Sequence, residues 1–405
     1  MQKAKRQSLV FCSTVLILLF VFAASRPALS AQGPVKLGLL LPYTSVFAVQ
    51  GTDTTKGFDL YLDQVGSKAG GREIQLIKED DEVKPDVGLA KLRKMVEKDQ
   101  VKLVVGTVSS AVALAIQDYV NREKVPMIIP VAFSRLITAP DKAGPSVFRV
   151  IETTDQSNYP MGEWVFKNTS YRRVIIMASD FVAGRDSVEA FMAGFKKAGG
   201  TIVREIYPPL NIQDFGPYLS RLTSENADAV YAWFAGSDAI RFLKQYEEYG
   251  LKGKLPLLGY NTLTDDTILP AVGDAAAGVI SVGQYSSTLD TPDNAAFVRA
   301  YKAKYGTSPT RYSANGYISA QLVVAAIEDL KGNIDNKEQF LEAIRRVAPK
   351  IKAVGGPIRF DRYQQVISNI YVMKTEKVGG QLVNTIISRI PEVSQEATWG
   401  WWQKK

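Results

Sequence analysis

Short apolar runs alternate with longer amphipathic stretches over the first part of the chain. The first run covers residues 35–41 and is stopped by Pro42. Runs of this kind are typical of strands buried on both faces of a parallel sheet. Similar runs follow at residues 73–77, 101–105, 125–130 and 147–150. Between them, apolar residues at helical spacing predict helices around residues 58–65, 86–96 and 110–123, with Asp86 as the N-cap of the second.

The same order of elements restarts after residue 170. Strands are predicted at residues 173–177, 201–203, 229–233 and 255–259, and helices at residues 187–198, 215–224 and 237–249. Strands that alternate with helices at this spacing indicate parallel sheets with helices on both faces. Two such blocks predict an α/β protein built from two doubly wound lobes. Ligands of such sheets bind outside the carboxyl ends of the strands, so these ends would form the walls of a cleft.

The pattern is looser after residue 279. Two helices are predicted over residues 314–330 and 337–348, and a strand over residues 367–373. The segment 393–405, which contains Trp399, Trp401 and Trp402, has no clear period. We expect this segment to be a tail that packs on a lobe surface or remains partly disordered.

The start of the chain differs from the rest. A basic segment with Lys3, Lys5 and Arg6 precedes an almost wholly apolar run over residues 9–24, and small residues stand before Ala31. This order is typical of a secretory signal peptide, which we place at residues 1–30. The alternative is a membrane anchor, but the apolar run is shorter than the ~20 residues that span a bilayer. We therefore expect export to the periplasm.

Cys12 is the only cysteine. It lies near the start of the apolar run rather than at its end, so lipidation is not expected and the mature chain has no thiol chemistry. The formal net charge is +8, of which four positive charges belong to the predicted signal peptide. The other charges are dispersed, without the basic stripe that is typical of nucleic-acid binding. The mild positive balance favours an anionic solute only weakly.

The sequence lacks the features of an enzyme. It contains no histidine, which excludes histidine-based triads and histidine–metal sites. It has no dinucleotide-binding glycine motif, P-loop or nucleophile elbow. The acidic cluster of Asp80, Asp81 and Glu82 is more typical of a solvated turn than of a metal site. We therefore expect no catalytic residue, no metal and no cofactor.

Several short motifs occur in a characteristic order. They are residues 36–42 with Gly51, residues 79–81, residues 104–106 with Ser109 and Ser110, Phe148 with Arg149, and residues 197–200, 242–245, 314–317 and 356–361. In this order they resemble the periplasmic solute-binding proteins of the branched-chain amino acid (leucine/isoleucine/valine) type, which serve ABC transporters. The resemblance covers nearly the whole mature chain.

The resemblance implies a type I periplasmic binding fold, in which two lobes joined by three crossovers close over the ligand. The crossovers would lie near Ile151, Gly283 and Val366. Lobe 1 would then comprise residues 34–151 and 283–366, and lobe 2 residues 152–282 and 367–392. The implied partners are a small-molecule ligand and the membrane permease of an ABC transporter, and the protein would act as a monomer.

Ser109 and Ser110 follow a predicted strand and open a predicted helix. Backbone N–H groups at a helix start, together with a serine hydroxyl, can hold a carboxylate. The resemblance implies this role, because the family uses the matching serine for the carboxylate of the ligand. The alternative is that both residues only cap the helix.

Three positions depart from the pattern of amino-acid binders. Phe133, beside Ala132, stands where a threonine usually helps to hold the ligand's ammonium group. Ala183 stands where the family often has a tyrosine, and Asn261 where a glutamate often pairs with the ammonium. Burying an ammonium group without a paired carboxylate is costly. We therefore expect a ligand with a carboxylate but no α-amino group, such as an aromatic acid or a short aliphatic acid.

Aromatic residues beside the predicted strand ends are candidates for the pocket lining, with ordinary core packing as the alternative for each. They are Phe133, Phe181, Trp233, Phe234 and Tyr260, with Tyr43, Phe47, Gln284 and Tyr285 at the rim. The family also supplies an aspartate near the ligand in the stretch that contains Thr154 and Asp155. Either residue is a candidate for that place.

These features predict an extracytoplasmic receptor of an ABC importer that captures a small organic acid by hinge closure. One alternative is a binding protein for a branched-chain or other amino acid. A second is a ligand-sensing domain that acts with a separate signalling partner, and a third is an enzyme on a two-lobed scaffold.

Overall fold

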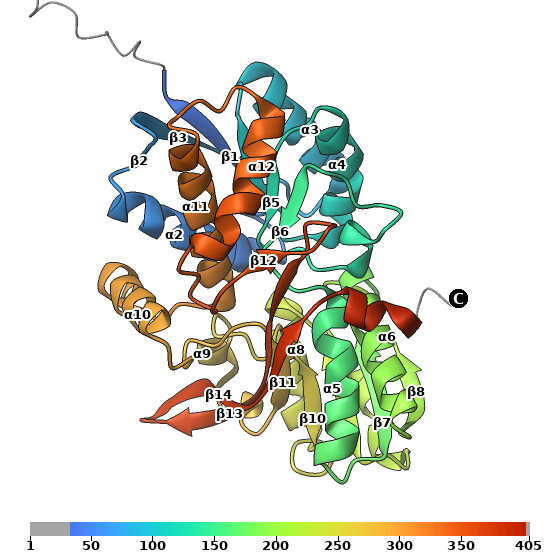
Figure 1. Ribbon diagram of the computed structural model, residues 1–405. Helices are drawn as coiled ribbons and strands as arrows, with labels where there is room; N and C mark the ends of the chain where they lie inside the picture. The colour runs from blue at the N-terminus through green and yellow to red at the C-terminus, as the bar shows by residue number, and fades with distance from the viewer. Residues whose placement is uncertain (1–32, 402–405) are drawn as a thin grey trace, which may run out of the picture. The chain divides into compact units, whose positions relative to one another are not determined.

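The apolar runs form the strands of two sheets, which the computed structural model shows with helices on both faces (Figure 1). The structure describes residues 33–401, with side chains up to Thr398. The predicted signal peptide and the end of the predicted tail lie outside the described residues. Among the described residues, no helix is both long and apolar enough to cross a membrane.

The first sheet has six strands in the order β2-β3-β1-β4-β5-β6. Their bounds are Val35–Leu41 (β1), Lys68–Ala69 (β2), Arg72–Asp80 (β3), Leu103–Gly106 (β4), Met127–Ile129 (β5) and Val147–Arg149 (β6). All neighbours are parallel except β2 and β3, which form an antiparallel pair. The carboxyl ends of β1, β4 and β5 therefore meet at one edge of the sheet.

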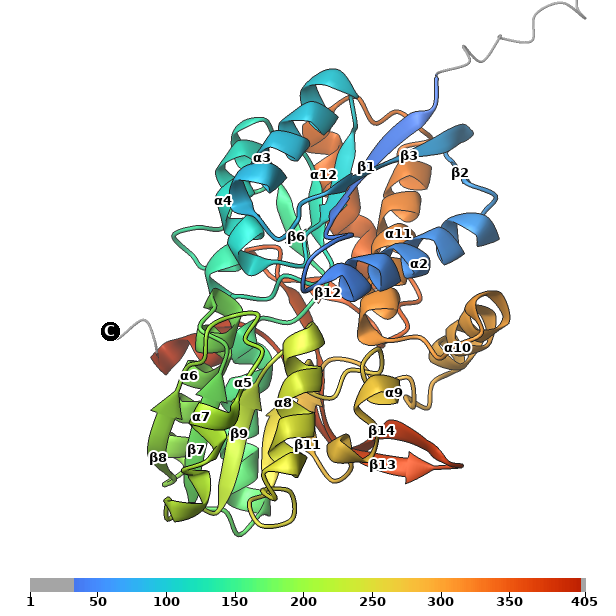
Figure 2. The ribbon, with the colours of Figure 1, turned by 180° about the vertical axis from the view of Figure 1, so that it is seen from behind.

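Side chains of β1 alternate between the two faces of this sheet. Leu37, Leu39 and Leu41 belong to one buried cluster, whereas Leu40 belongs to another. The first cluster includes α2 (Ala48–Gln64), α11 (Arg311–Asp329) and α12 (Lys337–Val347), and the second includes α3 (Pro85–Arg93) and α4 (Ser110–Arg122), which face the viewer in Figure 2. Because both faces are covered, the strands are continuous apolar runs.

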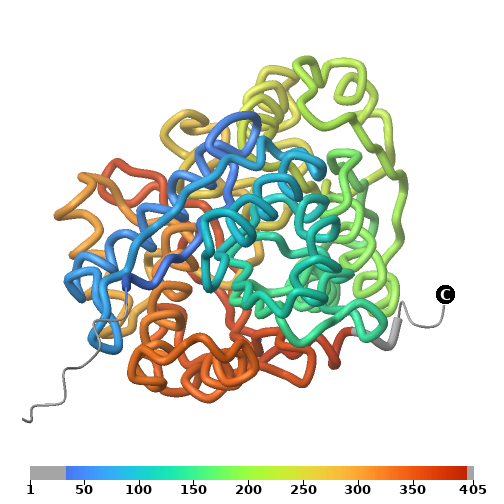
Figure 3. Tube along the Cα trace, turned by 90° about the horizontal axis from the view of Figure 1, so that it is seen from above, coloured from blue at the N-terminus to red at the C-terminus, as the bar shows by residue number. Residues whose placement is uncertain are grey.

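Helix α11 comes from far along the chain but packs on α2. Figure 3 shows the orange and blue segments that contain them side by side. A Cβ at Gly57 would lie 1.8 Å from the carbonyl oxygen of Ser313, and a Cβ at Gly316 would lie 2.0 Å from that of Thr54. Glycine at both positions therefore allows the close approach that brings the start of α11 to the strand ends.

The second sheet has the order β12-β13-β11-β10-β9-β7-β8, with β14 paired to β13. Its strands are β7 (Arg173–Ala178), β8 (Thr201–Ile206), β9 (Ala229–Trp233), β10 (Leu257–Tyr260), β11 (Ile280–Gly283), β12 (Arg359–Phe360), β13 (Val366–Val378) and β14 (Gln381–Val393). The strands from β7 to β11 are parallel, whereas β13 is antiparallel to its neighbours. Helices α5 (Thr154–Asn168) and α6 (Val182–Lys197) cover one face, and α7 (Gly216–Leu219) and α8 (Gly236–Glu248) the other.

Most predicted helices are present, but several of their boundaries differ, and α2 begins at Ala48, ahead of the predicted residue 58. Helix α3 follows Lys84, so Asp86 lies in its first turn and is not the N-cap. Helix α6 begins at Val182, ahead of the predicted residue 187. The predicted helix over residues 215–224 is instead the short α7, followed by a 3-10 turn at Leu222–Ser224.

Several elements are absent from the sequence-based prediction, among them two longer helices and one long strand. Helix α5 contains Pro160 and many buried polar residues, which hide its period. Helix α10 (Pro292–Tyr305) has few buried residues. Strand β14 forms a hairpin with β13 that turns at Gly379 and Gly380, whose φ angles are 58° and 84°. Paired glycines with positive φ favour tight hairpin turns.

The chain passes between the two sheets after β6, after β11 and before β12. Buried amides tie these segments together: Gln365 Nε2 donates to the Ile151 carbonyl oxygen at 2.7 Å, and Gln284 Nε2 donates to that of Val150 at 3.1 Å. The predicted lobe boundaries stay a prediction, because the chain from β1 onward forms one compact unit.

Candidate ligand-binding site

A cavity lies where the carboxyl ends of strands from both sheets come together. Its lining comes from the ends of β4, β5, β7, β9 and β10 and from the starts of α2 and α11. The lining residues are Phe47, Gln50, Val108, Val131, Phe133, Phe181, Ala183, Trp233, Ala235, Thr262, Arg311 and Tyr312. Ligands of open parallel α/β sheets bind at this position, so the cavity is the candidate site.

Four of the predicted aromatic residues line this cavity together. The ring centroid of Phe181 lies 6.1 Å from that of Phe47 and 6.3 Å from that of Trp233. The ring centroid of Phe133 lies 6.2 Å from that of Trp233. The predicted Tyr260 lies behind Phe133, with the two rings stacked at 4.7 Å and an interplanar angle of 16°. The aromatic lining therefore continues from residues beside the first sheet to residues beside the second.

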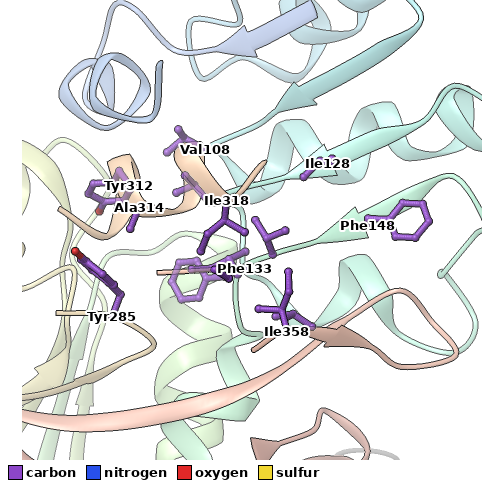
Figure 4. Close-up of a cluster of buried hydrophobic side chains, with 14 of the residues drawn as sticks. Val108, Ile128, Phe133, Phe148, Tyr285, Tyr312, Ala314, Ile318 and Ile358 are labelled. Atoms are coloured by element: carbon purple, nitrogen blue, oxygen red, sulfur yellow. The ribbon is translucent and has the colours of Figure 1, made fainter. Parts of the chain in front are cut away.

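The walls of the cavity are close together. Phe133 is only 4% exposed and belongs to the same buried cluster as Tyr285, Tyr312 and Ile318 (Figure 4). The free volume of the cavity is about 20 Å³, which is little more than the roughly 10–15 Å³ that one water needs. A ligand with an aromatic ring therefore fits only when the walls move apart, as hinge opening would allow.

Phe234 does not join this lining, contrary to the prediction. It packs on the opposite face of the second sheet, where its ring centroid lies 5.1 Å from that of Phe215 and 4.4 Å from that of Phe242. Successive residues of an extended chain point to opposite faces. Trp233 and Phe234 therefore belong to different buried clusters.

Arg311, the first residue of α11, places a positive charge in the lining and is only 3% exposed. Its Nη1 donates to the Tyr260 hydroxyl at 2.7 Å, and its Nη2 donates to the Tyr312 hydroxyl at 3.2 Å. The guanidinium carbon lies 4.5 Å from the ring centroid of Tyr312 and 5.0 Å from that of Tyr260. Nε lies 3.5 Å from Oδ2 of Asp265. The cation is thus held among aromatic rings and faces one carboxylate.

Arg311 is absent from the site predicted from the sequence, although a local signal was present. Thr310 is the N-cap of α11, and its hydroxyl oxygen accepts from the backbone N–H of Tyr312 at 3.2 Å. The N-terminus of a helix carries a partial positive charge, so an arginine directly after the N-cap is electrostatically unfavourable. An arginine at such a position indicates a role that compensates for this cost.

Several buried polar atoms at and beside the cavity have no hydrogen-bond partner within the described part of the chain. They include Nε1 of Trp233, Oγ1 of Thr262, Nε of Arg311, Oδ1 of Asn261 and Oε2 of Glu152. Leaving a buried polar atom unpaired costs about 1–3 kcal/mol. Three of these groups carry N–H or O–H donors on residues that line the cavity, which suits a ligand with acceptor oxygens.

A buried acid, Glu152, contacts the same Tyr260 hydroxyl to which Arg311 donates. Glu152 is fully buried, and its Oε1 accepts from the Tyr260 hydroxyl at 2.6 Å. Burial raises the pKa of Glu152, while the nearby Arg311 opposes this rise. Burial also raises the pKa of Asp265 to about 6, again against the effect of Arg311. Arg311, Tyr260 and Glu152 thus form a hydrogen-bonded chain that fixes the guanidinium.

Ser109 and Ser110 lie beside the cavity but do not line it. Ser109 is the N-cap of α4, and its Oγ accepts from the backbone N–H of Val112 at 3.3 Å. Ser110 Oγ accepts from the backbone N–H of Ser134 at 3.2 Å. The capping role of Ser109 is therefore present, and the role of both serines in holding a carboxylate stays a prediction.

The other predicted contact residues are placed around the cavity rather than in its lining. Ala132 donates its N–H to the Thr107 carbonyl oxygen at 3.0 Å, and the Thr154 hydroxyl oxygen accepts from the Arg135 N–H at 3.2 Å.

At the predicted rim, the Tyr285 hydroxyl donates to Asn294 Oδ1 at 2.8 Å, and the hydroxyls of Tyr43 and Thr55 lie 2.9 Å apart. Asn261, which is 4% exposed, donates its backbone N–H to the Val282 carbonyl oxygen at 2.9 Å. Their part in binding stays a prediction.

A second group of charged residues lies next to the cavity, and we call it the Arg135 cluster. It consists of Ser134 and Arg135 after β5, Asp155 in α5, and Asp186 and Glu189 in α6. The Arg135 guanidinium lies 3.4 Å from Asp155, 3.3 Å from Asp186 and 2.6 Å from Glu189. The Ser134 hydroxyl donates to Asp186. Burial raises the pKa of Asp155 to about 7, against the opposing effect of Arg135.

A wider groove of about 1040 Å³ lies between the start of α2, the residues after α10 and the β13–β14 hairpin. Its charged lining residues are Lys56, Lys302, Lys377, Asp53, Asp266 and Asp274. Thr310 lines this groove, whereas Arg311 lines the cavity. The start of α11 therefore separates the two hollows.

The acidic cluster at the end of β3 forms a turn. Asp80 Oδ1 accepts from the backbone N–H groups of Tyr43 at 3.0 Å and Glu82 at 2.8 Å. Asp81 is buried rather than solvated as predicted, and burial raises its pKa to about 7. Within the described residues, no group of three or more His, Cys, Asp or Glu side chains is placed to hold a metal.

Comparison with known proteins gives consistent matches. Residues 34–380 match the family described as periplasmic binding protein. Leu/Ile/Val-binding protein homolog 6 of Brucella melitensis is 29% identical over 371 residues, which cover 89% of this chain and 92% of that protein. An ABC transporter substrate-binding protein from Sphaerobacter thermophilus is 35% identical with a TM-score of 0.83, covering 89% and 99% of the two chains. An ABC transporter solute-binding protein from R. palustris in complex with benzoate is 30% identical with a TM-score of 0.84, covering 90% and 99%.

Proposed function

Because the chain belongs to the periplasmic binding protein family, we propose that it is the receptor of an ABC importer for an aromatic carboxylic acid. The resemblance to the branched-chain amino acid type and the α/β fold predicted from the sequence are both confirmed. Its relatives are solute-binding proteins, so the chain binds a small molecule and is not an enzyme. The identity of that molecule is the subject of the proposal.

The composition of the cavity lining carries the proposal. Among the described residues that line it, five are aromatic, Arg311 is positively charged and none is acidic. An α-ammonium group buried there would lack a carboxylate partner, which is costly. An aromatic acid would place its ring against the aromatic side chains and its charge against the arginine. Both parts of such a ligand therefore match the site.

The positions that distinguish this chain from amino-acid binders agree with the same ligand. Phe133 and Ala183 both line the cavity, where a threonine and a tyrosine would be expected in an amino-acid binder. Ala183 adds no hydroxyl group to the lining, and Phe133 adds an aromatic wall. The R. palustris protein in complex with benzoate supports an aromatic acid, whereas the name of the Brucella melitensis relative supports the alternative, a branched-chain amino acid.

The proposed receptor acts outside the cytoplasmic membrane. A cleaved signal peptide at residues 1–30 would direct it to the periplasm, and the closed form would deliver the ligand to a membrane permease.

A thermal-shift screen of the mature protein tests the proposal. The panels are aromatic acids, short aliphatic acids and the branched-chain amino acids. A ligand present at ~100 times its dissociation constant adds about 2.7 kcal/mol to the free energy of unfolding. We expect a clear rise in Tm with aromatic acids only. A rise with leucine, isoleucine or valine and none with aromatic acids would refute the proposed ligand.

A further inference from the structure

We infer that the carboxylate of the ligand is held by the guanidinium of Arg311, the indole N–H of Trp233 and the hydroxyl of Thr262. We call these three residues the carboxylate clamp. The inference rests on the proposed function and deepens it by assigning the ligand's charged end to one side of the cavity. It differs from the sequence-based expectation, which assigned the carboxylate to Ser109 and Ser110.

Arg311 has N–H donors to spare. A guanidinium carries five N–H donors in a planar fork, which can hold a carboxylate through two parallel hydrogen bonds. One N–H donates to the Tyr260 hydroxyl and one to the Tyr312 hydroxyl, and Nε has no hydrogen-bond partner among the described residues. The same two tyrosine bonds fix the plane of the guanidinium. Its remaining donors are therefore oriented before a ligand arrives.

Trp233 and Thr262 supply two further donors at the same cavity. They are 1% and 2% exposed, and neither Nε1 of Trp233 nor Oγ1 of Thr262 has a partner within the described part of the chain. A Cβ at Gly184 would lie 2.9 Å from Cε3 and 3.3 Å from Cζ3 of Trp233. That edge of the indole thus faces α6, and Nε1 lies on the opposite edge. Both unpaired groups can donate to an acceptor in the cavity.

Asp265 does not occupy all the N–H donors of Arg311, so the guanidinium can also pair with the carboxylate of a ligand. Asp265 lies 3.5 Å from Nε but also accepts from the Thr267 backbone N–H at 2.9 Å and hydroxyl at 2.7 Å. Asp265 is therefore shared between Arg311 and its own turn. Arginine can hold more than one carboxylate, as Arg135 does in this protein. A ligand carboxylate at Arg311 would add to the existing pair rather than displace it.

The clamp also limits the distance between the ring and the carboxylate of the ligand. Trp233 contributes its ring to the aromatic wall and its N–H to the clamp, so the two subsites adjoin. The guanidinium carbon of Arg311 lies 5.9 Å from the ring centroid of Phe133, another wall residue. The ligand class is therefore an acid whose carboxylate is attached to the ring directly or through one carbon, such as benzoate or phenylacetate. A longer spacer would move the carboxylate away from the donors.

Titration calorimetry with benzoate and its neutral analogue benzamide tests the clamp. Thr262→Val keeps the side-chain shape and removes mainly a donor, whereas Trp233→Phe keeps an aromatic ring but removes the donor together with part of a buried ring system. We expect each to weaken benzoate binding by roughly 10- to 100-fold, because a charged acceptor loses one hydrogen bond. Benzamide should lose less, because it is uncharged. Arg311→Gln should abolish the preference for benzoate over benzamide.

Matched controls separate a lost donor from a damaged fold. Thr264→Val and Trp164→Phe make the same chemical changes at residues outside the cavity lining, and they should leave benzoate affinity unchanged. Circular dichroism and Tm of every variant report whether it folds, so the conservative variants keep the test valid even if Arg311→Gln does not fold.

The outcomes distinguish the two proposals. If the wild-type protein binds no aromatic acid, the proposed function fails and the clamp with it. If it binds benzoate but Thr262→Val and Trp233→Phe both bind it as tightly, the clamp alone is refuted. If Ser109→Ala loses benzoate affinity and neither clamp variant does, the serines rather than the clamp hold the carboxylate, and the inference is refuted.

Discussion

The cavity and the Arg135 cluster lie side by side, and both join elements of the two sheets, but they differ in how their polar groups are paired. In the cavity, Trp233 and Thr262 keep buried donors without partners among the described residues. In the Arg135 cluster, one guanidinium contacts three carboxylates at 2.6–3.4 Å. The two regions are connected along the chain, because Phe133 of the cavity wall comes just before Ser134 and Arg135.

This difference indicates two separate roles. Unpaired buried donors cost free energy, so the cavity is completed only by a ligand that pairs with them. In the Arg135 cluster each carboxylate contacts the Arg135 cation, so its charges are compensated within the protein, and the one atom without a hydrogen-bond partner among the described residues of the cluster, Asp155 Oδ2, is an acceptor rather than a donor. We therefore expect changes in the cavity to alter affinity and selectivity, and changes in the cluster to alter mainly the stability of the closed arrangement.

The largest expected effect is that of Arg135→Met on stability. Removing one partner of a buried ion pair leaves the other charge uncompensated and costs about 3–5 kcal/mol. Asp155 and Asp186, whose side chains are 1% and 9% exposed, would lose their shared cation. Urea unfolding of the mature protein measures this loss.

The matched control for that variant is Arg346→Met. Arg346 pairs with Asp329 on the surface, where its side chain is 47% exposed, and exposed pairs contribute only about 0–1 kcal/mol. The ratio of benzoate to benzamide affinity should be the same in both variants. A loss of stability in Arg135→Met as small as that in Arg346→Met would contradict the role given to the cluster.

A smaller effect is expected from pH. The pKa of Asp155 is raised to about 7 in the folded protein, above the value near 3.9 of an unfolded chain. Between these values the folded state holds a proton that the unfolded state has lost, so the free energy of unfolding falls as pH rises, by up to about 1.4 kcal/mol per pH unit. Below pH ~4 both states hold the proton and the dependence on this group ends.

Asp155→Asn removes this contribution. We expect its free energy of unfolding, measured by urea at pH 5 and pH 7, to fall less over this interval than that of the wild type. Asp81 and Asp265 also have pKa values raised by burial, to about 7 and about 6, and they contribute equally to both proteins. Equal slopes in the two proteins would show that Asp155 does not titrate in this range.

The smallest expected effect is that of Ser109→Ala. Loss of an N-cap hydroxyl costs about 1 kcal/mol, and Ser109 caps α4 through the Val112 N–H. With the carboxylate held by the clamp, benzoate affinity should not change. Measurements of Tm and of the dissociation constant on the same variant separate these two effects. A weaker affinity for benzoate would show that Ser109 contributes to ligand binding.

Much of the fold could be predicted because both sheets are buried on both faces. Val174 and Ile175 of β7 belong to different buried clusters, and this double burial produces the continuous apolar runs that mark parallel strands. Helix α5 could not be predicted in the same way, because its inner face is polar: Gln156 donates from Nε2 to the carbonyl oxygens of Val366 and Val393 at 2.9 and 2.6 Å. Hydrophobic periodicity does not detect a helix packed through amide hydrogen bonds.

The candidate site was predictable where it depends on strand ends and not where it depends on distant contacts. Phe133, Phe181 and Trp233 stand at or just after the ends of strands, so topology alone brings them together. Arg311 reaches the same place only because α11 packs closely on α2, which no local pattern indicates. Phe234 was predicted to line the cavity but does not, because it follows Trp233 directly and successive residues of an extended chain point to opposite faces.

Binding of an aromatic carboxylate in the cavity is tested most directly by a calorimetric titration of the mature protein after unfolding and refolding to remove any bound ligand. Benzoate and leucine are titrated separately. We expect benzoate to saturate one site with a negative heat-capacity change, since apolar surface is buried on binding, and leucine to produce no binding heat. Saturable binding of leucine together with no binding of benzoate would contradict this expectation.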